Sequence, residues 1–73
     1  MQQKKRIFTG ERFPDRVGKI VAAEERRDGG VRLIYVIVDK LGRQIIDPLF
    51  NLPFTARVED FERYMQAGRL RWA

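Results

Sequence analysis

Basic side chains and aromatic rings are interleaved over the first nineteen residues of the chain. Guanidinium and ammonium groups bind phosphate oxygens, and aromatic rings stack on unpaired bases. We expect phosphate contacts from six cations and a base contact from one ring in a proline-flanked loop: Lys4, Lys5, Arg6, Arg12, Arg16, Lys19 and Phe13. The alternative is a solvated basic tail whose rings, Phe8 and Phe13, lie in the core.

Residues 69–72 alternate basic and apolar side chains, as a strand with one buried face does. Arg69 and Arg71 would share one face of this strand, and Leu70 and Trp72 the other. We therefore expect the two arginines to contact phosphate, and Trp72 to cover the core rather than stack on a base. The arginines extend the N-terminal basic region if the chain ends pair, as neighbouring termini commonly do.

An apolar segment containing two prolines lies between residues 48 and 54. It is too apolar for an ordinary loop, and its prolines would interrupt the interior of a strand. Two interpretations are open: its side chains plug one end of a barrel, or they form an exposed patch for a protein partner or a second copy. We favour the plug, because so short a chain has a thin core. The residues concerned are Leu49, Phe50, Leu52 and Phe54.

The chain lacks the residues that most often perform catalysis or bind metal. It contains no Cys, no His and no Ser, which removes the common nucleophiles, the common general base and most zinc ligands. Asp39 and Asp47 flank a hairpin and are interpreted as turn formers, and residues 24–27 as a solvated hairpin tip. We therefore expect no enzymatic activity, no cofactor and no metal.

Size and charge limit the remaining possibilities. The 73 residues have room for a single domain over 1–73, of which we expect residues 1–5 to be disordered. The net charge is +5, and eleven of the fifteen basic residues are Arg, which binds phosphate in a forked geometry. The longest apolar run, 33–38, is far shorter than the about 20 residues that span a bilayer. Absence of cysteine fits the cytoplasm, and we expect no membrane association.

Strand patterns dominate the first two thirds of the chain. Residues 7–9 predict a short strand, and residues 17–46 predict a three-stranded antiparallel meander with a bulge or bend at Gly18. One helix is expected from a Thr55 cap to about Ala67, with Val58, Phe61 and Met65 on its buried face. Glu59 and Arg63 are spaced to pair on this helix, and Gly68 is placed to end it.

These elements predict an α+β, mainly β domain: a small curled antiparallel sheet of four or five strands, or a partly open barrel, with one helix near the C-terminus. Through strand number, turn spacing and the stretch 18–21, the layout resembles Src-homology-3-like small barrels, which implies a fold and no site residues. We expect a non-catalytic domain that binds DNA or RNA through phosphate contacts. The alternative is a protein-interaction module or homodimer that uses segment 49–54 or a sheet edge.

Overall fold

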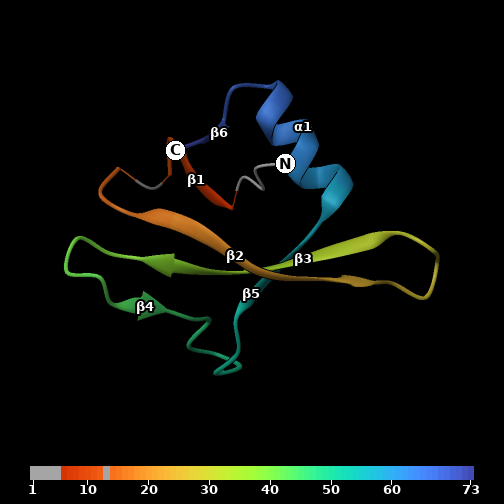
Figure 1. The fold of residues 1–73 in the computed structure, drawn as a ribbon, viewed down its shortest axis with the longest axis horizontal. Coiled ribbons are helices and arrows are strands. Elements are labelled where there is room, and N and C mark those ends of the chain that lie inside the picture. Colours follow the sequence, from red (N-terminus) through yellow and green to blue (C-terminus); the bar gives the residue numbers. More distant parts are fainter. Residues whose placement is uncertain (1–5, 13) are drawn as a thin grey trace, which may run out of the picture.

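The computed structural model describes residues 6–12 and 14–73, so the expectations for Lys4, Lys5, Phe13 and disorder over 1–5 lie outside the described residues. Figure 1 shows a curled antiparallel sheet with one helix beside it. The described chain forms six strands and this helix, in the order β1 (Ile7–Gly10), β2 (Val17–Glu25), β3 (Val31–Val38), β4 (Gln44–Ile45), β5 (Phe54–Arg57), α1 (Val58–Gln66) and β6 (Leu70–Trp72). The expected α+β, mainly β class is confirmed.

Strand β3 is the centre of the sheet. One edge of β3 pairs with β2 along its whole length, and the other edge is shared by β4 and β5. This position explains why β3 is apolar on both faces. Val36 and Ile37 are consecutive and so point to opposite faces of the sheet, yet they are only 4% and 5% exposed, which shows that both faces of β3 are covered here. The meander of β2, β3 and β4 is therefore as expected from the sequence.

Strand β5 is the element that the sequence did not predict. Residues 54–57 pair with β3, and Thr55 lies opposite Ile34 instead of capping a helix. The helix begins at Val58, and its N-cap is Arg57, whose side chain makes no capping hydrogen bond. The expected Thr55 cap is wrong, because the backbone groups of Thr55 are committed to the sheet. The strand also raises the number of strands from the expected four or five to six.

The core is built around Phe8, whose side chain is 2% exposed. Its ring meets Tyr35 edge-on at 5.5 Å and Phe61 of α1 edge-on at 4.9 Å. Gly18 lies opposite Phe8 in the β1–β2 ladder, and a Cβ there would lie 2.2 Å from Cζ of the Phe8 ring. Gly18 therefore makes room for a ring, and the expected bulge at this glycine is wrong. The register shift lies further along β2, between Ile20 and Ala22.

The helix packs against β3, β5 and β6 and covers the open side of the curled sheet (Figure 1). Gly68, with φ 76°, ends it as expected, and β6 then pairs with β1, so the two ends of the described chain lie together. Trp72 contacts Phe61 at a ring distance of 5.5 Å and keeps 37% of its surface exposed. Within residues 6–12 and 14–73, no helix has the length and apolar character needed to cross a bilayer.

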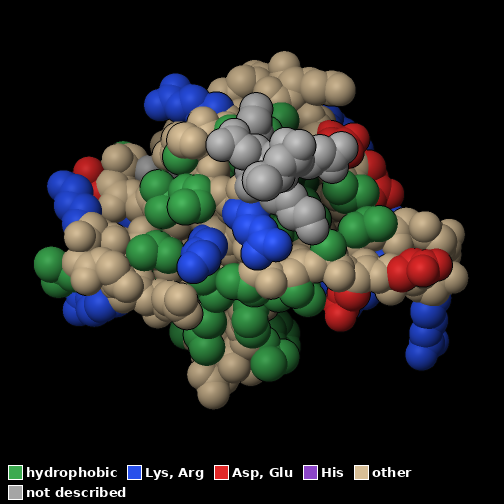
Figure 2. Space-filling view, viewed as in Figure 1, with side chains coloured by type: hydrophobic (Ala, Val, Ile, Leu, Met, Phe, Trp, Pro, Cys, Tyr) green, Lys and Arg blue, Asp and Glu red, His purple; other side chains and the backbone are tan. Residues whose placement is uncertain are grey.

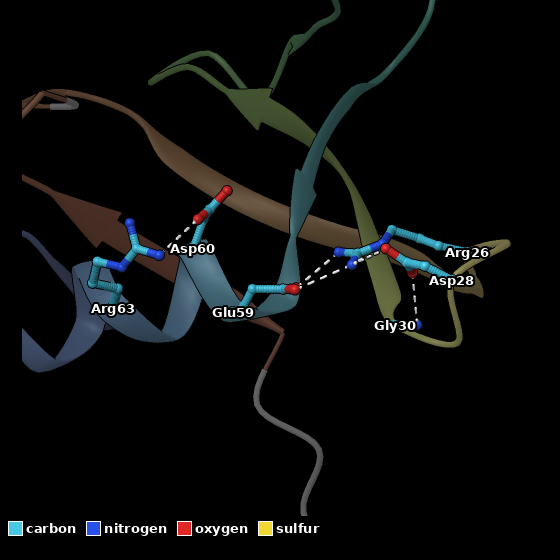
Figure 3. Close-up of polar contacts among 6 residues, drawn as sticks. All are labelled: Arg26, Asp28, Gly30, Glu59, Asp60 and Arg63. Carbon is cyan, nitrogen blue, oxygen red and sulfur yellow. Dashed lines mark hydrogen bonds and ion pairs between the residues drawn. The ribbon is translucent and has the colours of Figure 1, made fainter.

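Ionic contacts fasten the β2–β3 hairpin to the start of α1 (Figure 3). The Arg26 guanidinium donates to Asp28 and to Glu59 at 2.8 Å each, and its side chain is only 13% exposed. The expectation of a solvated tip is therefore wrong for Arg26. Because Glu59 is engaged with Arg26, the expected Glu59–Arg63 pair is also wrong, and Arg63 lies 3.3 Å from Asp60.

Two acidic residues of the following turns act as the sequence predicted. The Asp39 carboxylate accepts hydrogen bonds from the backbone N–H groups of Leu41 and Arg43, both at 2.9 Å. The Asp47 carboxylate accepts one from the backbone N–H of Leu49, also at 2.9 Å. Such bonds hold the pKa of Asp39 below its ordinary value, because they stabilise its charged form. Both side chains therefore shape turns.

Candidate nucleic-acid interface

The acidic residues neutralise only part of the positive charge. Six described cations form ion pairs with carboxylates, namely Arg26, Arg32, Lys40, Arg43, Arg63 and Arg69. Seven others form no ion pair among the residues that the structure describes: Arg6, Arg12, Arg16, Lys19, Arg27, Arg57 and Arg71. Of these, Arg57 still interacts electrostatically with Asp28 and Glu59. Five of these seven belong to the set that the sequence singles out for phosphate contact. Their charges are thus available to an external anion.

Strand β1 brings two of these cations to one face of the sheet. It pairs with β2 on one side and with β6 on the other, with Lys19 opposite Ile7 and Arg71 opposite Thr9. Because residues directly opposite each other point to the same face, Lys19 and Arg71 share the face that carries Ile7 and Thr9. Phe8 points to the other face, toward α1. Strands lie about 4.8 Å apart, so the two cations flank β1 at a separation of roughly 10 Å or more.

The remaining unpaired cations of the predicted set lie at the two ends of β1. Arg12 and Arg16 follow it in the loop to β2, and Arg6 precedes it. At the loop end, the backbone N–H of Glu11 donates to the Arg69 carbonyl at 3.3 Å, so Arg69 also lies there. We call the exposed cations around this strand the β1 basic strip. Its members are Arg6, Arg12, Arg16, Lys19 and Arg71.

The strip is not a flat surface. Lys19 and Arg71 lie on the outer face, whereas Arg6 and Arg12 line two separate grooves on the side of the helix. Figure 2 shows basic side chains beside hydrophobic ones over β1 and β2. In the same view, acidic side chains gather mainly on the side of α1 and the β2–β3 hairpin. A polyanion that follows the strip therefore runs along one end of the molecule, past an edge of the sheet.

A groove of about 190 Å³ lies beside the strip, between α1, β6 and the loop after β1. Four aromatic residues line it, with Ala56 and Leu70 as further apolar contacts: Phe8, Tyr35, Phe61 and Tyr64. Glu11, Arg12 and Arg69 complete the lining. Burial raises the pKa of Tyr35, because its phenolate form would lose hydration, so this phenol stays protonated at neutral pH. The groove thus combines flat apolar surface with two guanidinium groups.

The structure changes which aromatic residues are available to a ligand. Phe8, one of the two rings interleaved with the basic residues, is buried in the core and cannot stack on a base. Tyr64, which the sequence analysis did not select, is 44% exposed and lines the groove. A signal for it was present, because Tyr64 follows Phe61 by three residues and so lies on the side of the helix next to the apolar stripe of Phe61 and Met65.

A second basic cluster lies at the opposite end of the sheet and differs in character. Arg32 and Arg57 are direct neighbours across β3 and β5. Acidic groups surround them, since Arg32 pairs with Glu24 at 3.4 Å and Arg57 helps to lower the pKa of Asp28 and Glu59. The mixed signs make this cluster a weaker anion site than the β1 basic strip.

The apolar segment after β4 is exposed. Leu49, Phe50 and Leu52 are 81%, 67% and 60% exposed, so the expectation that they plug a barrel end is wrong. Phe54 alone packs inward, stacked on Tyr35 at 5.5 Å. The cause is a tight reversal in which the Asp47 and Leu52 backbones bridge and Asn51 takes a φ of 54°, which turns the intervening side chains outward. These three residues form an apolar patch at the end of the molecule opposite the helix.

No known protein family, curated protein or solved structure matches this chain. The similarity to Src-homology-3-like barrels therefore stays a prediction of layout.

Proposed function

We propose that this protein is a non-catalytic, cytoplasmic nucleic-acid-binding domain that holds the phosphate backbone through the β1 basic strip. The observation that carries the proposal is the uneven distribution of ion pairs. Acidic residues neutralise most cations elsewhere, whereas the five cations of the strip have no acidic partner in the described part of the chain. Phosphate contact releases condensed counterions, so such a strip gives salt-dependent and sequence-tolerant affinity.

The geometry of β1 suits an extended backbone. The strand is four residues long, which corresponds to about 13 Å, with cations at both ends and on both flanks. Arg predominates in the strip, and its fork contacts phosphate through two N–H groups while its plane stacks on bases. An extended single strand can follow both the outer face and the groove side, whereas a rigid duplex meets only one of them.

The test removes charge from the strip and compares it with equal removal elsewhere. Lys19→Gln combined with Arg71→Gln removes two unpaired cations from exposed strand positions. Lys40→Gln combined with Arg43→Gln removes the same charge from cations that have acidic partners and are 72% exposed. The proposal predicts weaker binding for the first variant, with a salt slope reduced by about 0.7 per lost contact on single strands. The second variant should resemble the wild type, and equal loss in both variants would contradict a localised site.

A second candidate function, as a protein-interaction module or homodimer, is favoured by the exposure of Leu49, Phe50 and Leu52. Contiguous exposed apolar side chains mark interaction sites in small soluble domains. The test is light scattering over a range of concentrations, with Phe50→Asp as the variant. A concentration-dependent dimer that Phe50→Asp disrupts without unfolding supports this function, and a monomer throughout removes the homodimer.

A further inference from the structure

We infer that the groove beside Tyr64 is a slot for one unpaired nucleobase, so that the protein prefers single-stranded to duplex nucleic acid. The inference rests on the proposed function and names the part of the nucleic acid that the site accepts. It is carried by three features of the groove: its aromatic lining, its size and the arginines at its rim.

The lining matches a planar ring. Phe8 and Phe61, which are 2% and 5% exposed, form an apolar wall and meet edge to face at a ring distance of 4.9 Å. Tyr64 is 44% exposed and offers its ring to a ligand without a change in the core. Base stacking on aromatic rings tolerates any base, because every base has a π-face. Tyr35, the fourth aromatic residue of the lining, adds further aromatic surface to the groove.

The size of the groove restricts what can enter. Its volume of about 190 Å³ is below the roughly 300–1,000 Å³ of pockets for drug-sized molecules. One ring system fits such a space, whereas a base pair does not. A base in a duplex would have to leave its stack and its partner before it could enter, at a cost of a few kcal/mol. The groove therefore selects nucleotides that are already unpaired.

The rim carries charge that complements the phosphates on either side of that base. Arg12 has no acidic partner in the described structure. Arg69 lies 3.9 Å from Glu11, with both side chains more than half exposed, so a phosphate can replace this long contact. Arg12 also belongs to the β1 basic strip, which makes the groove continuous with the path proposed for the backbone.

The experiment compares two single-stranded probes that have equal charge. One is a short oligothymidylate and the other is an abasic oligonucleotide of the same length, and binding is measured by fluorescence anisotropy. The base slot predicts tighter binding of the oligothymidylate by about 5- to 150-fold, which is the range for stacking one base. Tyr64→Leu should abolish this preference, Tyr64→Phe should retain it, and Leu49→Ala should leave it unchanged as a control for lost exposed apolar surface.

The outcomes separate this inference from the proposed function. Equal, salt-dependent binding of both probes overturns the base slot and leaves the phosphate strip in place. A preference that Tyr64→Leu retains, in a variant whose circular dichroism shows a native fold, also overturns the slot. Absence of binding to either probe at low salt removes both proposals.

Discussion

The contact between Gly18 and Phe8 makes a quantitative prediction about the stability of the sheet. Gly18 lies in β2 outside the left-handed region of φ, so alanine can adopt its backbone conformation. An added Cβ would nevertheless lie 2.2 to 2.6 Å from three atoms of the Phe8 ring. That ring packs edge-on against Tyr35 and Phe61, so a shift of the ring away from Gly18 would disturb both contacts. Gly18→Ala therefore acts as an overpacking substitution.

Overpacking a well-packed core costs about 1–3 kcal/mol. At about 0.05–0.15 kcal/mol per residue, a chain of this length has roughly 4–11 kcal/mol of total stability. A loss of about 2 kcal/mol corresponds to a fall in Tm of roughly 8–16 °C for a domain of this size. Both quantities are measured by urea unfolding and by thermal circular dichroism.

A double-mutant cycle shows whether the Phe8 ring is the cause. Phe8→Leu removes the ring atoms that the new Cβ would meet, so Gly18→Ala on that background should cost about 1 kcal/mol less than on the wild type. The difference between the two costs is the coupling energy of the contact. Additive effects, or a Gly18→Ala variant within about 0.5 kcal/mol of the wild type, would refute the packing argument.

Three further predictions concern the helix, the ion pairs of Arg26 with Asp28 and Glu59 (the ionic clamp), and the exposed apolar patch. Phe61→Ala removes a buried ring from α1 and should cost about 3–5 kcal/mol, measured by urea unfolding. Arg26 holds the pKa of Asp28 at about 2, against an ordinary value of 3.8, and also lowers the pKa of Glu59. The contribution of this clamp to the free energy of unfolding should be complete above about pH 5, where both carboxyl groups are ionised even in the unfolded chain. It should be lost as the pH falls through the lowered pKa values of Asp28 and Glu59. Arg26→Met should therefore make the free energy of unfolding fall less steeply in acid, as measured by unfolding curves at a series of pH values. Leu49→Ala should change the free energy of unfolding by less than about 0.5 kcal/mol, because this side chain is 81% exposed.

The sequence predicted those elements in which the local preference of the residues matches the place that they take in the fold. Residues 31–38 are β-branched and apolar on both faces, and they form the central strand, which needs both properties. Gly68 ends the helix because a residue with positive φ is required there. The alternation over residues 69–72 predicted a final strand, which is present as β6. Its pairing with β1 meets the condition under which Arg69 and Arg71 extend the N-terminal basic region.

The errors come from long-range contacts that a local pattern does not carry. Thr55 has the chemistry of a helix cap, but pairing with Ile34 holds it in a strand. Gly18 has the pattern of a bulge, but its neighbour is a ring ten residues earlier in the chain. Arg26 belongs to a polar stretch typical of an exposed tip, yet its contact with Glu59, far along the sequence, leaves the Arg26 side chain only 13% exposed.

The candidate site was predictable in composition but not in geometry. The cluster of cations near the N-terminus is evident from the sequence. That Lys19 and Arg71 share one face of the sheet follows only from the register of β1 with β2 and β6. The groove could not be derived from local patterns, because Tyr35, Phe61 and Tyr64 come from two elements that meet only in the fold. The interpretation as a plug failed for Leu49, Phe50 and Leu52, because the geometry of the reversal, not hydrophobicity, sets the direction of their side chains.

The most direct test of nucleic-acid binding is a salt titration of the wild-type protein with short single- and double-stranded DNA and RNA. Trp72 is the only tryptophan and lies next to β1, so its fluorescence reports on the strip, with labelled-oligonucleotide anisotropy as the second signal. The account predicts binding that weakens steeply with salt, with a linear dependence of log Kd on log salt and tighter binding of single strands. Absence of binding at low salt by a folded protein would contradict it.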